Sequence, residues 1–538
     1  MTDYASLLRD RTALTCRCID RIFIQGYVPR LQTVGQVCTY LHDVKGFPIP
    51  SSAAFGKIGD AYVRAIHRFA EQQGVPVVHF AKGENKEESA RRLLEAAPDD
   101  GKAKILLLGI AQEKASAWRS WKAKGHEKAA HPHMEWGRQM AQVNHFYWYV
   151  WDPQWGLCFI KTNAYAPYPV WCWLNGHEWA KRQLARRGIT YRELDNGFWS
   201  CDKPAVLQHI CNSLGPGAVK AFFRRWTNVL PSPFTPQDRR RGYGYDLAFR
   251  QLEISETRVF DRPQTARGFF EGMIKDHLDI GRPDRVSLTF DRRVSRRTPG
   301  RFQTKVVTKG VDPQISAVYR SSKIKVYLKE GRALRAEVTV NDTYDFGIGR
   351  LVNQANWAAL RTIGESANSR LCDALASDAA PAPDVVAFQR VTRPSTTTDG
   401  LHAPGLRFGD PRVMATLAAT CRFAHVFTGF ANRDLREMVA SLLDCDYGAR
   451  QATYDLRRLR RKGLIVRIPA TFRYQLTPFG REIAVFFTKT YSRVLAPGLA
   501  LLDPAIPSDV ATRSPLAVGW RAFDRALDHY LADQMTAA

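Results

Sequence analysis

The spacing of hydrophobic positions predicts helices and strands mixed along the N-terminal part of the chain. Residues 62–73 repeat apolar positions at helical spacing, whereas residues 104–111 (KILLLGIA) form a short apolar run typical of a buried strand. Residues 144–161 are rich in aromatic side chains and are interrupted by Asp152 and Pro153, which predicts two further strands. A helix follows over residues 174–187. We therefore expect an α/β region over residues 1–229.

The next part of the chain combines strand patterns with a high density of basic residues. Residues 291–310 carry seven lysines and arginines around a Pro-Gly turn, which predicts a charged hairpin. Residues 316–341 read as three short strands. We expect a basic antiparallel β region over residues 235–373. The segment 374–408, rich in Ala, Pro, Ser and Thr, is predicted to be a linker.

The C-terminal part predicts three helices followed by a hairpin and a further helix. Helices are expected over residues 411–427 and 433–443, and a third one carries apolar positions on one face and arginines on the other. Gly463 ends this third helix, and residues 464–468 and 472–476 flank a turn. The order resembles the winged-helix DNA-binding family, in which the third helix lies in the major groove. A winged-helix domain with a C-terminal helical extension is thus expected over residues 409–538, within an α+β multidomain protein.

The charge balance indicates a polyanionic partner. The chain has 78 Lys and Arg residues against 52 Asp and Glu, a net charge of +26, which favours nucleic acid. A membrane is not expected, because no stretch approaches the roughly 18 apolar residues of a spanning helix. The N-terminus lacks a signal-peptide pattern, and ten irregularly spaced cysteines suit a reducing compartment. We expect a cytoplasmic protein.

The candidate nucleic-acid-binding residues are the basic side chains that cluster within predicted elements. Such side chains can contact phosphates, although a solvated surface or a protein-docking role is the alternative. They are Lys181, Arg182, Arg186, Arg187, Arg292, Arg293, Arg296, Arg297, Arg301, Lys305, Lys323, Lys325, Arg457, Arg458, Arg460, Arg461, Lys462, Arg467 and Arg473.

Acidic and lysine side chains in the strand-rich regions are candidates for catalysis. Glu113 and Lys114 follow one buried strand, and Asp152 and Lys161 lie on the next hairpin. Together with Glu337 they suggest a Mg²⁺-dependent nuclease, in which carboxylates hold the metal and lysines stabilise developing charge. Ribonuclease-H-like folds are similar, but the aspartate expected on the first strand is missing. Salt-bridged surface residues are the alternative interpretation.

Residues 324–340 (IKVYLKEGRALRAEVTV) resemble a strand pair found in replication proteins of filamentous phages and some plasmids. The shared pattern is Tyr-x-Lys followed by Leu-Arg-x-Glu, here Tyr327, Lys329 and Leu334 to Glu337. The resemblance implies Tyr327 as a possible covalent nucleophile, whereas tyrosine in a strand is usually a packing residue. The phrases NGHEWAKRQ, RRTPGRF, LKEGRALRAE and YDLRRLRRKGL are similar to those of a family of basic bacterial proteins without an assigned activity.

Other cofactors are not expected. His131, His133, Cys16 and Cys18 lack a second ligand pair at zinc-site spacing, and no phosphate-binding GxxxxGK motif occurs. The dense aromatic residues between positions 147 and 173 suit either base stacking or a packed sheet. We therefore expect a nucleic-acid-binding protein of a mobile-element, replication or defence setting, acting on DNA or RNA. It is either a metal-dependent nuclease or a non-catalytic scaffold or winged-helix regulator.

Overall fold

The computed structural model describes most of the chain. The described residues are 8–81, 84, 86–96, 101–122, 134–277, 304–309, 312–319, 321–346, 348, 356–376, 384–397, 399–421, 429–469, 471–491 and 515–536.

One long sheet is the framework of the first two predicted regions. Within the described residues it has eleven strands in the order β10-β11-β12-β13-β9-β1-β6-β5-β4-β3-β2, antiparallel except for β2 and β3. The strands are β1 (Thr12–Tyr27), β2 (Val77–His79), β3 (Lys104–Lys122), β4 (Met134–Asp152), β5 (Gly156–Asn163), β6 (Val170–Asn175), β9 (Asp246–Phe260), β10 (Thr304–Lys309), β11 (Asp312–Tyr319), β12 (Ser322–Lys329) and β13 (Ala333–Val340).

This sheet joins the two predicted regions. β1 of the N-terminal region pairs with β9, and β9 pairs with β13 of the central region. The predicted break near residues 230–234 therefore separates two helices, α7 and α8, and not two sheets. The strands predicted at residues 144–161 and 316–341 are confirmed as β4 and β5 and as β11 to β13.

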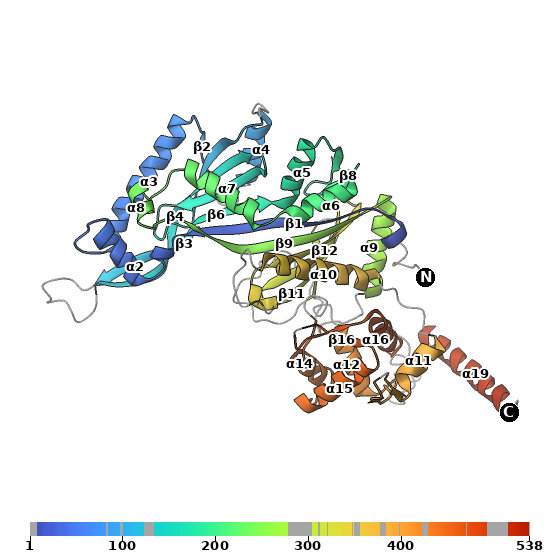
Figure 1. Cartoon of the computed structure of the whole chain (residues 1–538). Helices are drawn as coiled ribbons and strands as arrows, with labels where there is room; N and C mark the ends of the chain where they lie inside the picture. The colour runs from blue at the N-terminus through green and yellow to red at the C-terminus, as the bar shows by residue number, and fades with distance from the viewer. Residues whose placement is uncertain are drawn as a thin grey trace.

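Side chains alternate between the two faces of the sheet, as β12 illustrates. In β12, Ile324, Val326 and Leu328 are buried, whereas the intervening Lys325 and Tyr327 are half-buried on the other face. Helices pack on the sheet and cover its apolar residues (Figure 1). They are α3 (Ser52–Gln72), α4 (Lys86–Ala96), α5 (Gly176–Arg186), α6 (Pro204–Ser213), α7 (Pro216–Val229), α9 (Pro263–His277) and α10 (Trp357–Ala376), while α2 (Val34–Thr39) and α8 (Pro236–Arg240) lie in connections.

The free edge of β1 is closed by a helix and a small hairpin. Only residues 21–26 of β1 pair with β6, so the first half of the strand has one strand partner. Gln208 of α6 replaces the missing strand, because its amide accepts from the Arg17 N–H and donates to the Arg17 carbonyl, each at 2.9 Å. The hairpin of β7 (Tyr191–Glu193) and β8 (Phe198–Cys201) contacts β1 as well. This edge is therefore protected from pairing with another chain.

The C-terminal unit has its own hydrophobic core. It contains α11 (Val385–Thr392), β14 (Ser395–Thr396), β15 (His402–Ala403), α12 (Pro411–Thr420), α14 (Asn432–Leu443), α15 (Ala449–Arg461), β16 (Ile465–Arg467), β17 (Tyr474–Leu476) and α16 (Pro478–Thr490), and α19 (Pro515–Thr536) follows. Helices, hairpin and closing helix stand in the predicted order. Membership of the winged-helix family stays a prediction.

Part of the predicted linker belongs to this C-terminal unit. Val391 of α11 and Leu406 are buried in its core, and β14 pairs with β15. Because the segment is rich in Pro and Thr, its composition did not predict the short helix α11, whose apolar side packs against the core. The predicted linker of residues 374–408 is therefore shorter in the structure, where α10 also extends to Ala376.

A glycine at the start of α5 gives a direct test of the packing around β1. A Cβ atom on Gly176 would lie 1.8 Å from the Ile19 carbonyl oxygen, whereas one on Gly217 of α7 would meet no atom within 4 Å. We expect Gly176→Ala to destabilise the protein by about 1–3 kcal/mol or more, because backbone must move. Gly217→Ala should be neutral or stabilise by up to about 1 kcal/mol. Urea unfolding of both variants measures the difference, and equal midpoints would contradict this packing.

Candidate functional site

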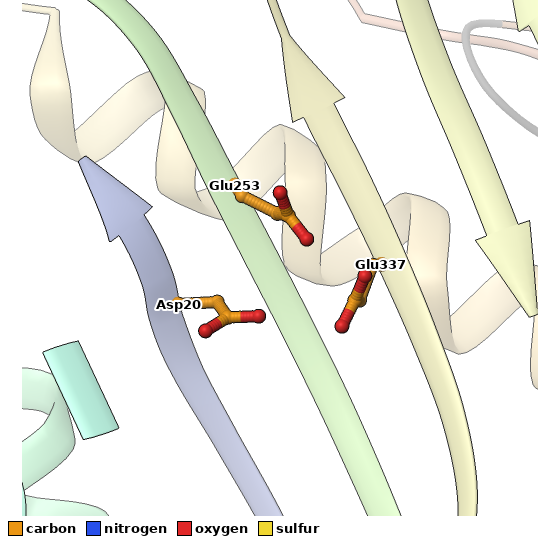
Figure 2. A group of neighbouring side chains, drawn as sticks. All are labelled: Asp20, Glu253 and Glu337. Atoms are coloured by element: carbon orange, nitrogen blue, oxygen red, sulfur yellow. The ribbon is translucent and has the colours of Figure 1, made fainter. Parts of the chain in front are cut away.

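Three buried carboxylates from three neighbouring strands form the most concentrated acidic group in the described residues. Asp20 of β1, Glu253 of β9 and Glu337 of β13 point toward one another (Figure 2), and their oxygens lie within 4.8 Å of one another. Their exposed fractions are 1%, 6% and 1%. We call these three residues the carboxylate triad.

The strand register explains why these side chains meet. Thr339 lies opposite Glu253, so Glu337, two residues earlier on the same face of β13, is its diagonal neighbour. Asp20 lies where the pairing of β1 with β9 is irregular, between Ile19 and Ile22. A bulge of this kind redirects a side chain, and it brings Asp20 to the face of the two glutamates.

Two basic side chains bind the triad directly. The Arg335 guanidinium is fully buried and lies 2.7 Å from both Asp20 and Glu337. The Lys325 amine forms an ion pair with Glu337 and lies 3.3 Å from Glu253. The predicted nucleic-acid-binding residue Lys325 and the predicted catalytic residue Glu337 are thus brought together.

Further polar groups fix the two ends of the triad. The Tyr327 hydroxyl donates to Glu337 at 2.8 Å. At the other end Asp20 accepts from the Asn196 amide at 2.5 Å and lies 3.3 Å from His177 Nδ1. Burial and the nearby Arg335 lower the pKa of His177, so its ring is neutral at pH 7. Asp20 is therefore held by a fixed set of donors.

The electrostatics of the triad leave one carboxyl protonated. Burial and the neighbouring Glu337 raise the pKa of Glu253 to about 8. Burial also opposes ionisation of Asp20 and Glu337, but Arg335 together with the other groups that contact each carboxylate outweighs it, and both pKa values are lowered. At neutral pH Glu253 therefore carries the proton of the group, as expected when like charges crowd together in a buried site.

The donor set fits a divalent cation. Carboxylate oxygens are the ligands that Mg²⁺ and Mn²⁺ prefer. Glu253 Oε1 and Glu337 Oε2 both contact the Lys325 amine, so this cation lies where oxygens of two carboxylates converge. Arg335, Lys325 and Arg21 lie beside the three carboxylates, and Glu253 carries a proton. Metal binding would displace that proton and move the Lys325 amine from between the glutamates.

Glu113 and Lys161 form a separate cluster, away from the triad. Glu113 accepts from Lys86 at 2.6 Å, from Lys161 at 2.5 Å and from the Tyr147 hydroxyl at 2.5 Å. These donors overcome the effect of burial and lower the pKa of Glu113 to about 2. The carboxylate is saturated by its own partners. Lys114 is exposed on the opposite side of the strand.

Asp152 does not join Glu113 either. It lies nine residues along β4 from Val143, the partner of Glu113, a separation of roughly 30 Å. Asp152 is completely buried and accepts from Arg225 at 2.8 Å and from the Trp226 indole at 3.0 Å. These contacts give it a structural role, so the predicted joint site of Glu113 and Asp152 does not form.

The basic residues of α5 are divided between structural contacts and solvent. Lys181 is buried and paired with Glu178 at 2.7 Å and with Glu193 at 3.2 Å. The Arg182 guanidinium lies over the Trp151 ring, and Arg186 donates to the Pro153 carbonyl. Arg187 is exposed. Lys181 is thus an internal residue of the fold.

Several predicted basic residues of the central region cannot be placed. Arg292, Arg293, Arg296, Arg297 and Arg301 lie outside the described residues. Only the backbone of Lys305 is described, in β10. Lys323 of β12 already interacts with another group of the protein.

Five of the seven predicted DNA-contacting residues of the C-terminal unit donate to its own backbone. Arg458 donates to the Pro404 and Gly405 carbonyls, Arg461 to His402, and the buried Lys462 to Arg390 and Arg393. These contacts attach α15 to the segment that was predicted to be a linker. The wing residues are also engaged: Arg473 with Gly429 and Asp434, and Arg467 with Thr471.

Arg457 and Arg460 differ from their neighbours. Both are exposed on α15, and neither side chain has an ion pair or hydrogen bond within the described part of the chain. Arg450, at the start of the same helix, is exposed as well. These three arginines are available to an external partner.

The aromatic residues are packed on both faces of the sheet. Trp148, Trp155 and Tyr168 are buried in the core. On the other face, Phe23, Trp173 and Phe159 stack in a half-buried row with centroids 4.1 and 4.6 Å apart. Phe23 lies opposite Gln251, two residues from Glu253, so this row shares the face of the triad.

Asp20 and Glu253 were missed because no short motif contains them. They stand 233 positions apart in the chain, and each follows an apolar residue within a strand. An acid beside apolar neighbours, after Ile19 in one strand and between Leu252 and Ile254 in the other, is the signal that could have indicated them. Glu337 was found because it ends a recognisable strand-pair pattern.

Comparisons with known proteins give no family. No family model matches the chain, and no curated protein matches it. A solved rolling circle replication initiator protein from Geobacillus stearothermophilus aligns with 81% of this chain and 99% of its own, at 9% identity and a TM-score of 0.20. That score is too low to indicate a shared fold. In the described residues no helix has the length and hydropathy to span a membrane.

The shared proton predicts a pH-dependent stability. The pKa of Glu253 rises from 4.5 to about 8 on folding, so the folded state binds the proton more tightly. The stabilisation of the folded state by this proton is complete below pH 4.5. It is lost as the pH rises toward 8, and the free energy of unfolding then falls by no more than about 1.4 kcal/mol per pH unit. We expect Glu253→Gln to flatten the decline between pH 5 and 8.

Urea midpoints measured across this range with a chelator present provide the comparison. Glu113→Gln is the control, because a carboxyl with a pKa of about 2 stays ionised throughout. Parallel curves for wild type and Glu253→Gln would contradict the assigned protonation.

Proposed function

We propose that the carboxylate triad binds a divalent metal ion and cleaves a phosphodiester bond of a nucleic acid. The observation that carries this proposal is the convergence of three buried carboxylates on one face of the sheet. The net charge of +26 supports a polyanionic substrate. A mobile-element, replication or defence setting and a cytoplasmic location remain predictions, as does the choice between DNA and RNA.

Basic side chains at the triad suit a phosphate. Lys325 and Arg21 lie between the carboxylates and solvent: the Lys325 side chain is 23% exposed, and Arg21 is exposed. Although burial lowers it, the pKa of Arg21 is raised by Glu253, Asp20 and Glu337, which places this cation beside the triad. A phosphate drawn to these two cations would lie against the carboxylates. The bound metal would supply Lewis-acid stabilisation of the developing charge.

We propose Tyr327 as the nucleophile; burial and Glu337 raise the pKa of its hydroxyl, so its activation requires a base in direct contact. Its hydroxyl already donates to Glu337, so that carboxylate can take the phenolic proton as the Tyr327 oxygen bonds to phosphorus. The bond from phosphorus to the leaving strand oxygen then breaks, and that oxygen takes a proton from water. The product is a covalent tyrosyl ester. Attack by water would give free ends and no adduct.

Glu253→Gln is the sharpest test of the metal site. Glutamine matches the protonated carboxyl in shape and charge, so the fold should be retained while one metal ligand is weakened. We expect cleavage of a labelled single-stranded oligonucleotide with Mg²⁺ or Mn²⁺ to slow by about 10²-fold or more, a loss of roughly 3 kcal/mol in transition-state stabilisation. Binding in a chelator should be unchanged.

Glu113→Gln is the matched control and should retain cleavage. Equal activity of the Glu253→Gln variant, or cleavage that persists in a chelator, would refute the metal site. The Tyr327→Phe variant distinguishes attack by Tyr327 from attack by water. Loss of a labelled adduct that survives denaturing electrophoresis supports Tyr327, whereas undiminished cleavage without any adduct assigns the attack to water.

A non-catalytic DNA-binding role is the second candidate, and exposed arginines on α15 favour it. If the unit is a winged helix, this helix enters the major groove. Arg457→Ala with Arg460→Ala should weaken duplex binding and reduce the slope of log K against log salt by about 2. Lys462→Ala should instead lower the thermal midpoint, because it removes a buried contact. Unchanged salt dependence in the double variant would exclude this helix as a DNA contact.

A further inference from the structure

A second candidate site lies at the opposite end of β1 and β9. There a cavity of about 410 Å³ is lined by the paired strand residues Tyr27 and Asp246, by α7 and by the segment around α8. Tyr27 is seven residues from Asp20 along β1, roughly 23 Å away. The cavity is therefore separate from the carboxylate triad.

One wall of the cavity is cationic. Lys220 and Arg224 stand four residues apart, on one side of α7. Arg239 of α8 adds a third positive charge. Within the described residues none of the three has an ion pair, and the lining includes the single acid Asp246. This contrasts with Lys45 and Arg225 in the same region, which are paired with Asp238 and Asp152.

Aromatic side chains form another part of the lining. Phe223 and Phe234 are buried residues of the lining, and Tyr27 is half-buried beside them. The volume lies within the 300–1,000 Å³ range of small-ligand sites. A ligand that satisfies both walls carries an anion on one side and a flat apolar group on the other.

We infer that this cavity binds a nucleotide unit, with its phosphate at Lys220, Arg224 and Arg239 and its base against the aromatic wall. The unit is either a free nucleotide or one nucleotide of a bound strand, since both present the same chemistry. This inference does not rest on the proposed cleavage activity. It concerns binding without metal, at residues that contribute nothing to the triad.

The test is binding by the full chain in a chelator. The probes are dAMP and inorganic phosphate, measured by calorimetry, and a labelled 20-nucleotide oligothymidylate, measured by anisotropy. The variant is Lys220→Ala with Arg224→Ala. The matched control is Arg64→Ala with Arg68→Ala, an exposed pair at the same spacing on α3 that lies outside the cavity. Both variants lose two positive charges.

We expect the cavity variant to bind dAMP or the oligonucleotide at least about 10-fold more weakly than the control does. If only oligonucleotide binding is weakened, the cavity holds one nucleotide of a bound strand. If dAMP binding is weakened, the cavity binds a free nucleotide. If both variants weaken binding equally, the loss of net positive charge explains the effect, and the inference is overturned. Binding of inorganic phosphate as tightly as dAMP would overturn it as well, because the aromatic wall would then contribute nothing. Metal-dependent cleavage by the cavity variant reports on the triad independently of either result.

Discussion

The ion pairs of Arg335 with Asp20 and Glu337 are the interaction on which the candidate site depends. A guanidinium cannot lose its charge in a protein, and Arg335 is fully buried, so its position requires acids beside it. Asp20 and Glu337 supply them from two strands that lie on either side of β9. Removing one partner of such a pair typically costs about 3–5 kcal/mol. The close approach of the Asn196 carbonyl to Arg335 adds the β7–β8 hairpin to the same group.

This constraint also explains the unusual state of Glu253. Arg335 pairs with Asp20 and Glu337 but not with Glu253, so Glu253 is left in a buried position beside another carboxylate, with the Lys325 amine 3.3 Å away. A purely structural network would be more stable with an apolar side chain in its place. A buried glutamate that must stay protonated at neutral pH is therefore destabilising relative to an apolar residue. Binding of a cation in place of the proton would explain why a glutamate stands at this position.

Local pattern was sufficient for some of the strands, but it did not predict β1 and β9 and was insufficient for the site. The alternation in residues 324–340 predicted β12 and β13 together with Tyr327 and Glu337, because those residues follow one another on paired strands. Asp20 and Glu253 come from strands whose pairing with β13 depends on the order of the whole sheet, and no spacing in the sequence encodes that order. The bulge that turns Asp20 inward is equally invisible to periodicity.

The same limit applies to the basic residues. The sequence treats every lysine and arginine as a possible phosphate contact, yet Lys181, Lys462 and Arg458 are held by carboxylates or carbonyls of the fold itself. Cations that have no ion pair among the described residues include Lys220, Arg224 and Arg239 at the cavity, and Arg457 and Arg460 on α15. A nucleic-acid strand that passes the triad along β1 would reach the first of these groups, while the second lies on a unit with a separate core. If the chain binds nucleic acid as proposed, these two surfaces can each attract it, and the cavity is built on the same strands β1 and β9 as two of the carboxylates.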